Sequence, residues 1–163
     1  MQQKISPFLW YTSEADEAAK LYASIFPDSR VTRVTALPTD TPSGPAGTVK
    51  VVEFLLFGQP FMAISAGPLD AFNHAVSFVV KCETQAEIDR YWNAFLEAGG
   101  KPEQCGWLQD RYGLFWQIVP SHLGDMMSDP DPAKAKRTAE AMLLMQKFDL
   151  AALEAAHAGK TAR

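Results

Sequence analysis

Apolar residues in the first part of the chain follow a strand pattern, then a helical pattern and then three more strand patterns. We expect a strand at residues 5–11, followed by a helix that Thr12 or Ser13 caps, with Asp16 completing a capping box. Pro27 ends that helix. The later strands are expected at residues 29–37, 49–56 and 61–66, with a long proline- and glycine-rich loop at 38–48.

The same order of patterns starts again in the second part of the chain. A strand is expected at residues 75–82, and Thr84 with Glu87 forms a capping box for a helix that Gly99 closes. Since several strands are apolar on both faces and only two main helices are available, we expect an α+β fold with a curved sheet, helices outside and a cavity inside. Short extended segments follow the second helix at 101–104, 107–109 and 114–119.

A tight turn is expected between the last two of these segments. Asp110 and Gly113 are favoured first and fourth residues of a four-residue turn. We expect Asp110 and Arg111 to lie in solvent there, with at most a weak ion pair between them.

Gln117 is an uncharged polar residue in the middle of an otherwise apolar strand. Alternation places it on one face with Phe115 and Val119, while Leu114, Trp116 and Ile118 share the other face. A buried amide needs a hydrogen-bond partner, which can be a neighbouring strand, water or a ligand. Gln117 is therefore a candidate for ligand binding, with a purely structural role as the alternative.

Glu53 is a carboxylate at the centre of another apolar strand. Burial of a carboxylate is costly unless it is paired, hydrogen-bonded or protonated. We therefore expect Glu53 to face a wet cavity or to meet a cation, with a solvent-exposed edge position as the alternative.

The last part of the chain, residues 121–163, has the pattern of a helical tail. One helical turn is expected at 122–127, and Asp131 with Pro132 starts a longer helix. Asp149 caps a final helix. We expect this tail to pack either on its own subunit or on a neighbouring one.

Composition excludes several classes of protein. The 163 residues carry a net charge of −4 without a Lys/Arg run, which argues against nucleic acid and anionic membranes as partners. Cys82 and Cys105 have no metal-binding spacing, and ordinary thiols suit a reducing compartment. The first six residues are too polar for a secretion signal and no stretch is apolar enough to span a membrane, so we expect a cytoplasmic protein.

Seven short runs occur in a characteristic order: P-F-L-W-Y, F-P-D-S-R, G-P-A-G-T-V, G-Q-P-F, F-N-H-A-V-S-F, C-G-W-L-Q-D-R-Y-G-L-F-W-Q-I-V-P and D-P-D-P-A-K-A. In order and spacing they resemble the PhnB-like proteins of the vicinal oxygen chelate superfamily, which includes glyoxalase I, extradiol dioxygenases and bleomycin resistance proteins. The resemblance implies a homodimer and a single domain over residues 1–163. Its parts would be two βαβββ modules at 5–66 and 74–120, which form a cupped mixed sheet, and the helical tail at 121–163.

The resemblance also indicates where the enzymes of the superfamily hold a divalent metal. Those positions fall near Pro7, at Ala63 or Ser65, and on His74 and Gln117. Only His74 is a good ligand, whereas a catalytic metal centre usually has about three protein ligands. We therefore expect neither a catalytic metal nor another cofactor.

Some PhnB-like proteins are labelled 3-demethylubiquinone 3-methyltransferase. A methyltransferase of the common kind would need a glycine-rich strand-to-helix turn, which this sequence lacks.

We expect a binding protein that sequesters a small, partly apolar molecule. His74 is either hydrogen-bonded to backbone at the start of a strand or a general base at the mouth of a cavity, and with Glu53 it is a catalytic candidate. The alternative function is a metal-dependent lyase or isomerase, and a third is a dimerisation module whose cups are filled by aromatic rings. The expected ligand-binding residues are Trp10, Glu53, Ser65, His74, Trp107 and Gln117.

Overall fold

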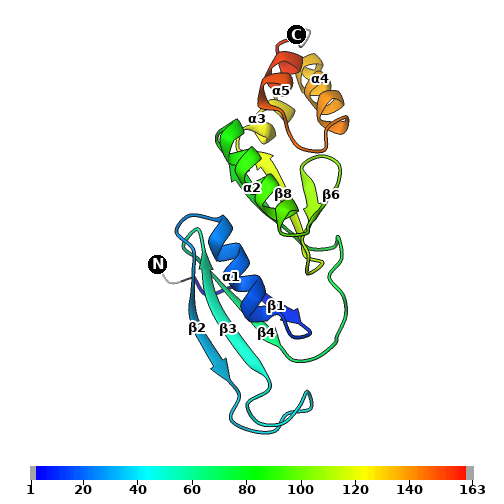
Figure 1. The fold of residues 1–163 in the computed structure, drawn as a ribbon. Coiled ribbons are helices and arrows are strands. Elements are labelled where there is room, and N and C mark those ends of the chain that lie inside the picture. The colour runs from blue at the N-terminus through cyan, green and yellow to red at the C-terminus, as the bar shows by residue number, and fades with distance from the viewer. Residues whose placement is uncertain (1–2, 161–163) are drawn as a thin grey trace. The chain divides into compact units, whose positions relative to one another are not determined.

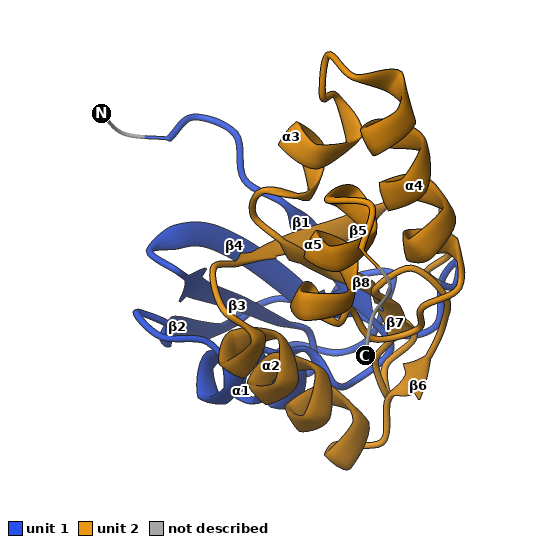
Figure 2. Cartoon of the chain, turned by 90° about the horizontal axis from the view of Figure 1, so that it is seen from above, with its two compact units in different colours: residues 1–71 blue, residues 72–163 orange. Residues whose placement is uncertain are grey.

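The computed structural model describes residues 3–160. The chain divides into two compact units, residues 1–71 and residues 72–163, which Figure 2 shows in blue and orange. Each unit contains a four-stranded mixed sheet and a helix that packs on it, and the second unit also contains the helical tail. The expected single domain with a shared cup stays a prediction.

The first unit has the order strand, helix, strand, strand, strand (Figure 1). Its sheet has the order β1-β4-β3-β2, in which β1 runs parallel to β4 and the other pairs are antiparallel. Its elements are β1 (Phe8–Tyr11), α1 (Ala15–Ile25), β2 (Arg30–Ala36), β3 (Lys50–Leu56) and β4 (Gln59–Ser65).

The second unit repeats this order and this pairing. Its sheet has the order β5-β8-β7-β6, again with the first and last strands of the module parallel and adjacent. The predicted α+β fold with two βαβββ modules is thereby confirmed. The elements are β5 (Ser77–Cys82), α2 (Gln85–Glu97), β6 (Lys101–Pro102), β7 (Trp107–Gln109) and β8 (Phe115–Pro120).

One face of each sheet is covered by the helix of its own module. In the first unit Val52, Phe54 and Leu56 of β3 are buried, and the Phe54 ring lies 6.5 Å from that of Tyr22 in α1. In the second unit the ring of Trp116 in β8 lies 5.0 Å from that of Phe95 in α2. Because side chains alternate along a strand, the residues between these positions lie on the opposite face, which we call the helix-free face of each sheet.

The two module helices begin in different ways. As predicted, Thr84 caps α2, since its side chain accepts a hydrogen bond from the amide of Glu87. The predicted cap of α1 by Thr12 or Ser13 is wrong, because that helix begins at Ala15 after an N-cap Glu14 whose side chain forms no cap hydrogen bond.

The turn between β7 and β8 has the predicted backbone hydrogen bond, but the side chain of Asp110 is buried and not in solvent as expected. The amide of Gly113 donates to the carbonyl of Asp110, as predicted. Asp110 is not in solvent, however, since only 4% of it is exposed. Its Oδ1 accepts from the amides of Tyr112 and Leu114 at 2.8 and 3.0 Å, and its Oδ2 accepts from the Trp116 indole at 3.0 Å. The carboxylate therefore joins the turn to the strand that follows it.

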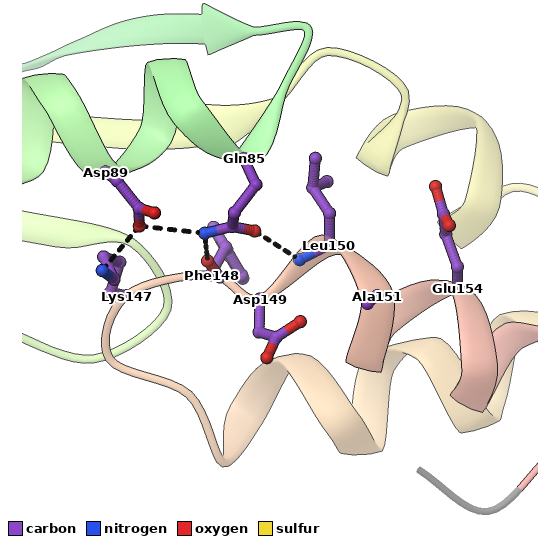
Figure 3. Close-up of a pocket in the computed structure, with 8 residues that line it drawn as sticks. All are labelled: Gln85, Asp89, Lys147, Phe148, Asp149, Leu150, Ala151 and Glu154. Carbon is purple, nitrogen blue, oxygen red and sulfur yellow. Dashed lines mark hydrogen bonds and ion pairs between the residues drawn. The ribbon is translucent and has the colours of Figure 1, made fainter. Parts of the chain in front are cut away.

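The tail packs on its own module through the segment around Phe148, which is 1% exposed. The Gln85 amide of α2 donates to the Phe148 carbonyl at 3.0 Å and accepts from the Leu150 amide at 2.8 Å (Figure 3). A methyl group at Gly106 would lie 2.5 Å from the Phe148 ring, so this contact also requires glycine there. The tail helices are α3 (Leu123–Met127), α4 (Pro132–Leu143) and α5 (Leu150–His157), with α4 and α5 capped by Asp131 and Asp149 as predicted.

Both cysteines are free. Burial, with the nearby carboxylates of Glu87 and Glu83, raises the pKa of Cys82 to about 12, so this thiol stays protonated and inert at neutral pH. Among the described residues, no helix has both the length and the apolar character that crossing a membrane requires.

Asp110→Ala removes the acceptor for two amides and one indole. Because unsatisfied buried donors are costly, we expect it to lower the free energy of unfolding by about 3 kcal/mol in urea titrations. The matched control is Asp70→Ala at an exposed position, where a change within about 0.5 kcal/mol is expected. Equal stabilities of the two variants would contradict a structural role for Asp110.

Phe148→Ala tests how the tail is anchored. Truncation of a fully buried phenylalanine leaves a cavity, so we expect the free energy of unfolding to fall by about 3–5 kcal/mol in the same assay. Leu144→Ala, in the same connection but 87% exposed, serves as the control and should have little effect. A small effect of Phe148→Ala would show that the tail does not stabilise the second unit.

Candidate functional site

The helix-free face of the second sheet carries a group of aromatic and polar side chains. Trp107 of β7 lies directly opposite Gln117 of β8, and Phe115 lies two residues along the same strand. Ser77 of β5 lies opposite Phe115 on the other side. The alternation predicted from the sequence for Phe115 and Gln117 is confirmed, because Trp116 and Ile118 between and beside them are buried on the other face.

His74 precedes β5 and lies over this group. Its imidazole lies 3.8 Å from the Phe115 ring and 5.9 Å from the Trp107 ring, measured between ring centroids. Its Nε2 lies 2.9 and 3.1 Å from the two carboxylate oxygens of Glu103. The side chain of His74 remains 61% exposed. His74 is thus held by a carboxylate and an aromatic ring rather than by backbone, and it remains accessible to a ligand.

Glu103 is the site residue that the sequence analysis missed. It follows the short strand β6, and its amide donates to the carbonyl of Trp107 at 2.8 Å. The sequence predicted both neighbouring extended segments, and pairing them as a hairpin would have placed Glu103 next to Trp107. Nothing in the local pattern indicated that its carboxylate would reach His74, which lies 29 residues earlier.

Gln117 finds its partner on the neighbouring strand. Its Nε2 donates to the hydroxyl of Ser77 at 2.9 Å. The partner is therefore a side chain of the neighbouring strand β5. Because the amide nitrogen is engaged, the carbonyl oxygen of Gln117 is the part of the side chain left to accept a hydrogen bond.

The helix-free face of the first sheet carries Trp10 and Glu53. The indole of Trp10 donates to the carbonyl of Gly67 at 2.9 Å. Glu53 lies opposite Arg33 of β2 and forms a salt bridge with it, while 34% of the carboxylate side chain stays exposed. Of the two expectations for Glu53, the structure thus shows the cation, and this ion pair needs no ligand.

Ser65 lies on the other face of the first sheet. Its Oγ accepts a hydrogen bond from the amide of Ala15 at 3.0 Å, so it holds the start of α1. Ala63, on the same face, is completely buried. The resemblance places the family's first-module metal position on Ala63 or Ser65. In β4 both side chains point to the face that the helix covers and not to the helix-free face.

Ser65 also lines a small polar pocket where the parallel strands β1 and β4 end. The pocket has a volume of about 270 Å³ and is rich in hydroxyl groups. Its lining residues are Thr12, Ser13, Ser43, Thr48, Val49, Lys50, Ser65, Ala66 and Gly67.

A larger open groove of about 730 Å³ lies between α2 and the tail (Figure 3). Lys147 and Asp89 form an ion pair of 2.6 Å in it, and the hydrogen bond from Lys147, with one from Gln85, lowers the pKa of the Asp89 carboxyl. These contacts fasten the tail to α2. Among the residues drawn, the polar groups of Gln85, Asp89 and Lys147 bind one another, which favours a structural role for the groove.

His74 and Glu103 place one nitrogen donor and one carboxylate side by side in the second unit. Within residues 3–160, no cluster of three or more His, Cys, Asp or Glu side chains could hold a metal ion. His74 and Glu103 supply one nitrogen and one carboxylate, whereas a catalytic centre usually has about three protein ligands.

A family model described as 3-demethylubiquinone-9 3-methyltransferase matches residues 3–119. The PhnB protein from Bacillus cereus is 32% identical, with 72% of this chain and 99% of that chain aligned at a TM-score of 0.64. No curated protein sequence matches this chain.

Two more distant structures share the fold alone. A protein from Pseudomonas aeruginosa is 22% identical over 71% of this chain and 95% of its own, with a TM-score of 0.53. The fosfomycin resistance protein FosX from Listeria monocytogenes is 14% identical over 77% of this chain and 96% of its own, with a TM-score of 0.56. The matched family model and the PhnB protein together show that this chain belongs to the PhnB-like family.

Proposed function

We propose that this protein binds a small, partly apolar molecule on the helix-free face of its second sheet and acts by binding or sequestering it. The observation that carries the proposal is the group formed by His74, Trp107 and Gln117 around the Phe115 ring. Small-molecule sites typically combine aromatic surface with a few placed polar groups. These residues provide both.

Each side chain has a distinct part in the proposed binding. Trp107 offers an aromatic face on which a flat ligand can stack. His74 and Gln117 offer hydrogen bonds to the polar edge of the ligand. In the first unit, Trp10 and Glu53 share a helix-free face of similar composition, and with Ser65 at the hydroxyl-lined pocket they remain ligand-binding candidates.

Methyl transfer, the activity named by the family description, has little support from the residues. A cofactor site of the common methyltransferase kind uses a glycine-rich connection from a strand to a helix. The connection before α1 is Thr12, Ser13 and Glu14, and the connection before α2 is Glu83 and Thr84. Neither contains glycine.

Binding by the aromatic group can be tested with 1-naphthol as the probe, using isothermal titration calorimetry. We expect Trp107→Ala and Gln117→Ala each to raise the dissociation constant about tenfold, which corresponds to a loss of about 1.4 kcal/mol. The first variant removes the stacking surface and the second removes an acceptor. Gln104→Ala, at an exposed glutamine of the preceding turn, should leave the affinity unchanged. Unaltered binding by all three variants, or no binding to the parent protein, would refute the proposed site.

The competing function is a metal-dependent lyase or isomerase, and the adjacent nitrogen and oxygen donors of His74 and Glu103 are the feature that favours it. Since these are only two ligands, we expect protein purified without a chelator to contain far less than one metal ion per chain by elemental analysis. We also expect His74→Ala to leave that metal content unchanged. Stoichiometric metal that His74→Ala removes would contradict this expectation and favour the competing function instead.

We further propose that the protein is a cytoplasmic homodimer. The two free thiols suit a reducing compartment, and the family resemblance supports the dimer. Light scattering of the purified chain measures the oligomeric state directly.

A further inference from the structure

We propose that Glu103 is a positioning residue for His74. It holds the imidazole as the tautomer that carries its hydrogen on Nε2, so that Nδ1 becomes a hydrogen-bond acceptor offered to the ligand. The tautomer can be tested on the free protein, whereas the ligand class that follows from it rests on the proposed function.

The hydrogen-bond geometry specifies the tautomer. Both carboxylate oxygens of Glu103 lie within hydrogen-bond distance of the same ring nitrogen, at 2.9 and 3.1 Å from Nε2. An ionised carboxylate can only accept hydrogen bonds, so Nε2 must be the donor. In a neutral imidazole the other nitrogen, Nδ1, then carries a lone pair.

The contact between the two side chains is held from both sides. The amide of Glu103 donates to the carbonyl of Trp107 at 2.8 Å, which ties Glu103 to β7. The Asn73 side chain accepts from the amide of Ala75 at 2.8 Å, which shapes the segment that carries His74. The imidazole itself lies on the Phe115 ring, which is only 4% exposed. The direction of Nδ1 is therefore fixed before any ligand arrives.

Nδ1 of His74 has no hydrogen-bond partner among residues 3–160. Gln117 offers a second acceptor, because it donates one amide hydrogen to Ser77 and its carbonyl oxygen remains available, beside one further amide hydrogen. Two acceptors favour a ligand whose edge carries O–H or N–H donors. A flat ligand of this class, such as a hydroxylated aromatic molecule, would stack on Trp107 and donate to these groups. A ligand with acceptors alone would leave Nδ1 of His74 unpaired, whereas Gln117 could still donate its second amide hydrogen.

The tautomer is measured on the ligand-free protein by nitrogen-15 NMR of His74, whose ring-nitrogen shifts distinguish the two neutral tautomers from each other and from the imidazolium. We expect the parent protein to show hydrogen on Nε2 alone. Glu103→Ala should raise the population with hydrogen on Nδ1 severalfold, and Glu103→Gln should reduce this effect because its amide oxygen can still accept. Glu97→Ala, an exposed glutamate at the end of α2, is the control and should change nothing.

A parent protein with hydrogen on Nδ1, or a tautomer that Glu103→Ala leaves unchanged, would overturn the role of Glu103. Neither result depends on ligand binding, so the proposed function could fail while this role is supported.

The ligand class is tested with a matched pair of probes, 1-naphthol and 1-methoxynaphthalene. The first carries a hydroxyl donor, and the second has a methyl ether in its place. We expect 1-naphthol to bind about tenfold more tightly to the parent protein by calorimetry, and we expect Glu103→Ala to remove most of this preference. Equal binding of the two probes to the parent protein would overturn the donor-bearing class. Absence of binding by both would overturn that class together with the proposed function, and the NMR result would still decide the role of Glu103.

Discussion

Each four-stranded sheet buries one face against a single helix, and this one-sided burial decides where the side chains of the two sheets point. Because strands alternate with a period of two, burying Phe54 under α1 turns Glu53 to the helix-free face, and burying Trp116 under α2 turns Gln117 the same way. A shift of one residue in either strand would reverse these assignments. The strand register that buries the core side chains therefore also places the candidate site residues on the helix-free face.

The hydrogen bonds and ion pairs of the polar side chains show which of them stabilise the fold and which remain available to a ligand. Asp110 uses both carboxylate oxygens on donors of its own turn and strand, and Ser65 accepts from the first amide of α1. Glu53 is neutralised by Arg33. His74 and Gln117 differ, because each keeps one hydrogen-bonding atom beyond its contact with the protein. This difference is the physical reason for placing the site on the second sheet.

Membership of the PhnB-like family establishes the fold but does not assign the chemistry. The resemblance places one metal position of the superfamily's enzymes at Ala63 or Ser65, and both residues lie on the helix-covered face. His74 keeps a good ligand type, but its carboxylate partner Glu103 comes from a different strand region than the superfamily's ligand positions. This chain thus carries a combination of side chains that differs from the metal positions of the superfamily's enzymes, and its function depends on the side chains that are present.

The sequence by itself determined the elements and their faces, because hydrophobic alternation, capping residues and turn residues act over a few positions. It predicted the two βαβββ modules, the cap of α2 by Thr84 and the sharing of one face by Phe115 and Gln117. Only the tertiary structure decided contacts between distant segments: Glu103 with His74, Ser65 with Ala15, and Phe148 with Gly106. These contacts depend on which strands are neighbours and how far each side chain reaches, and neither quantity is encoded in a local pattern.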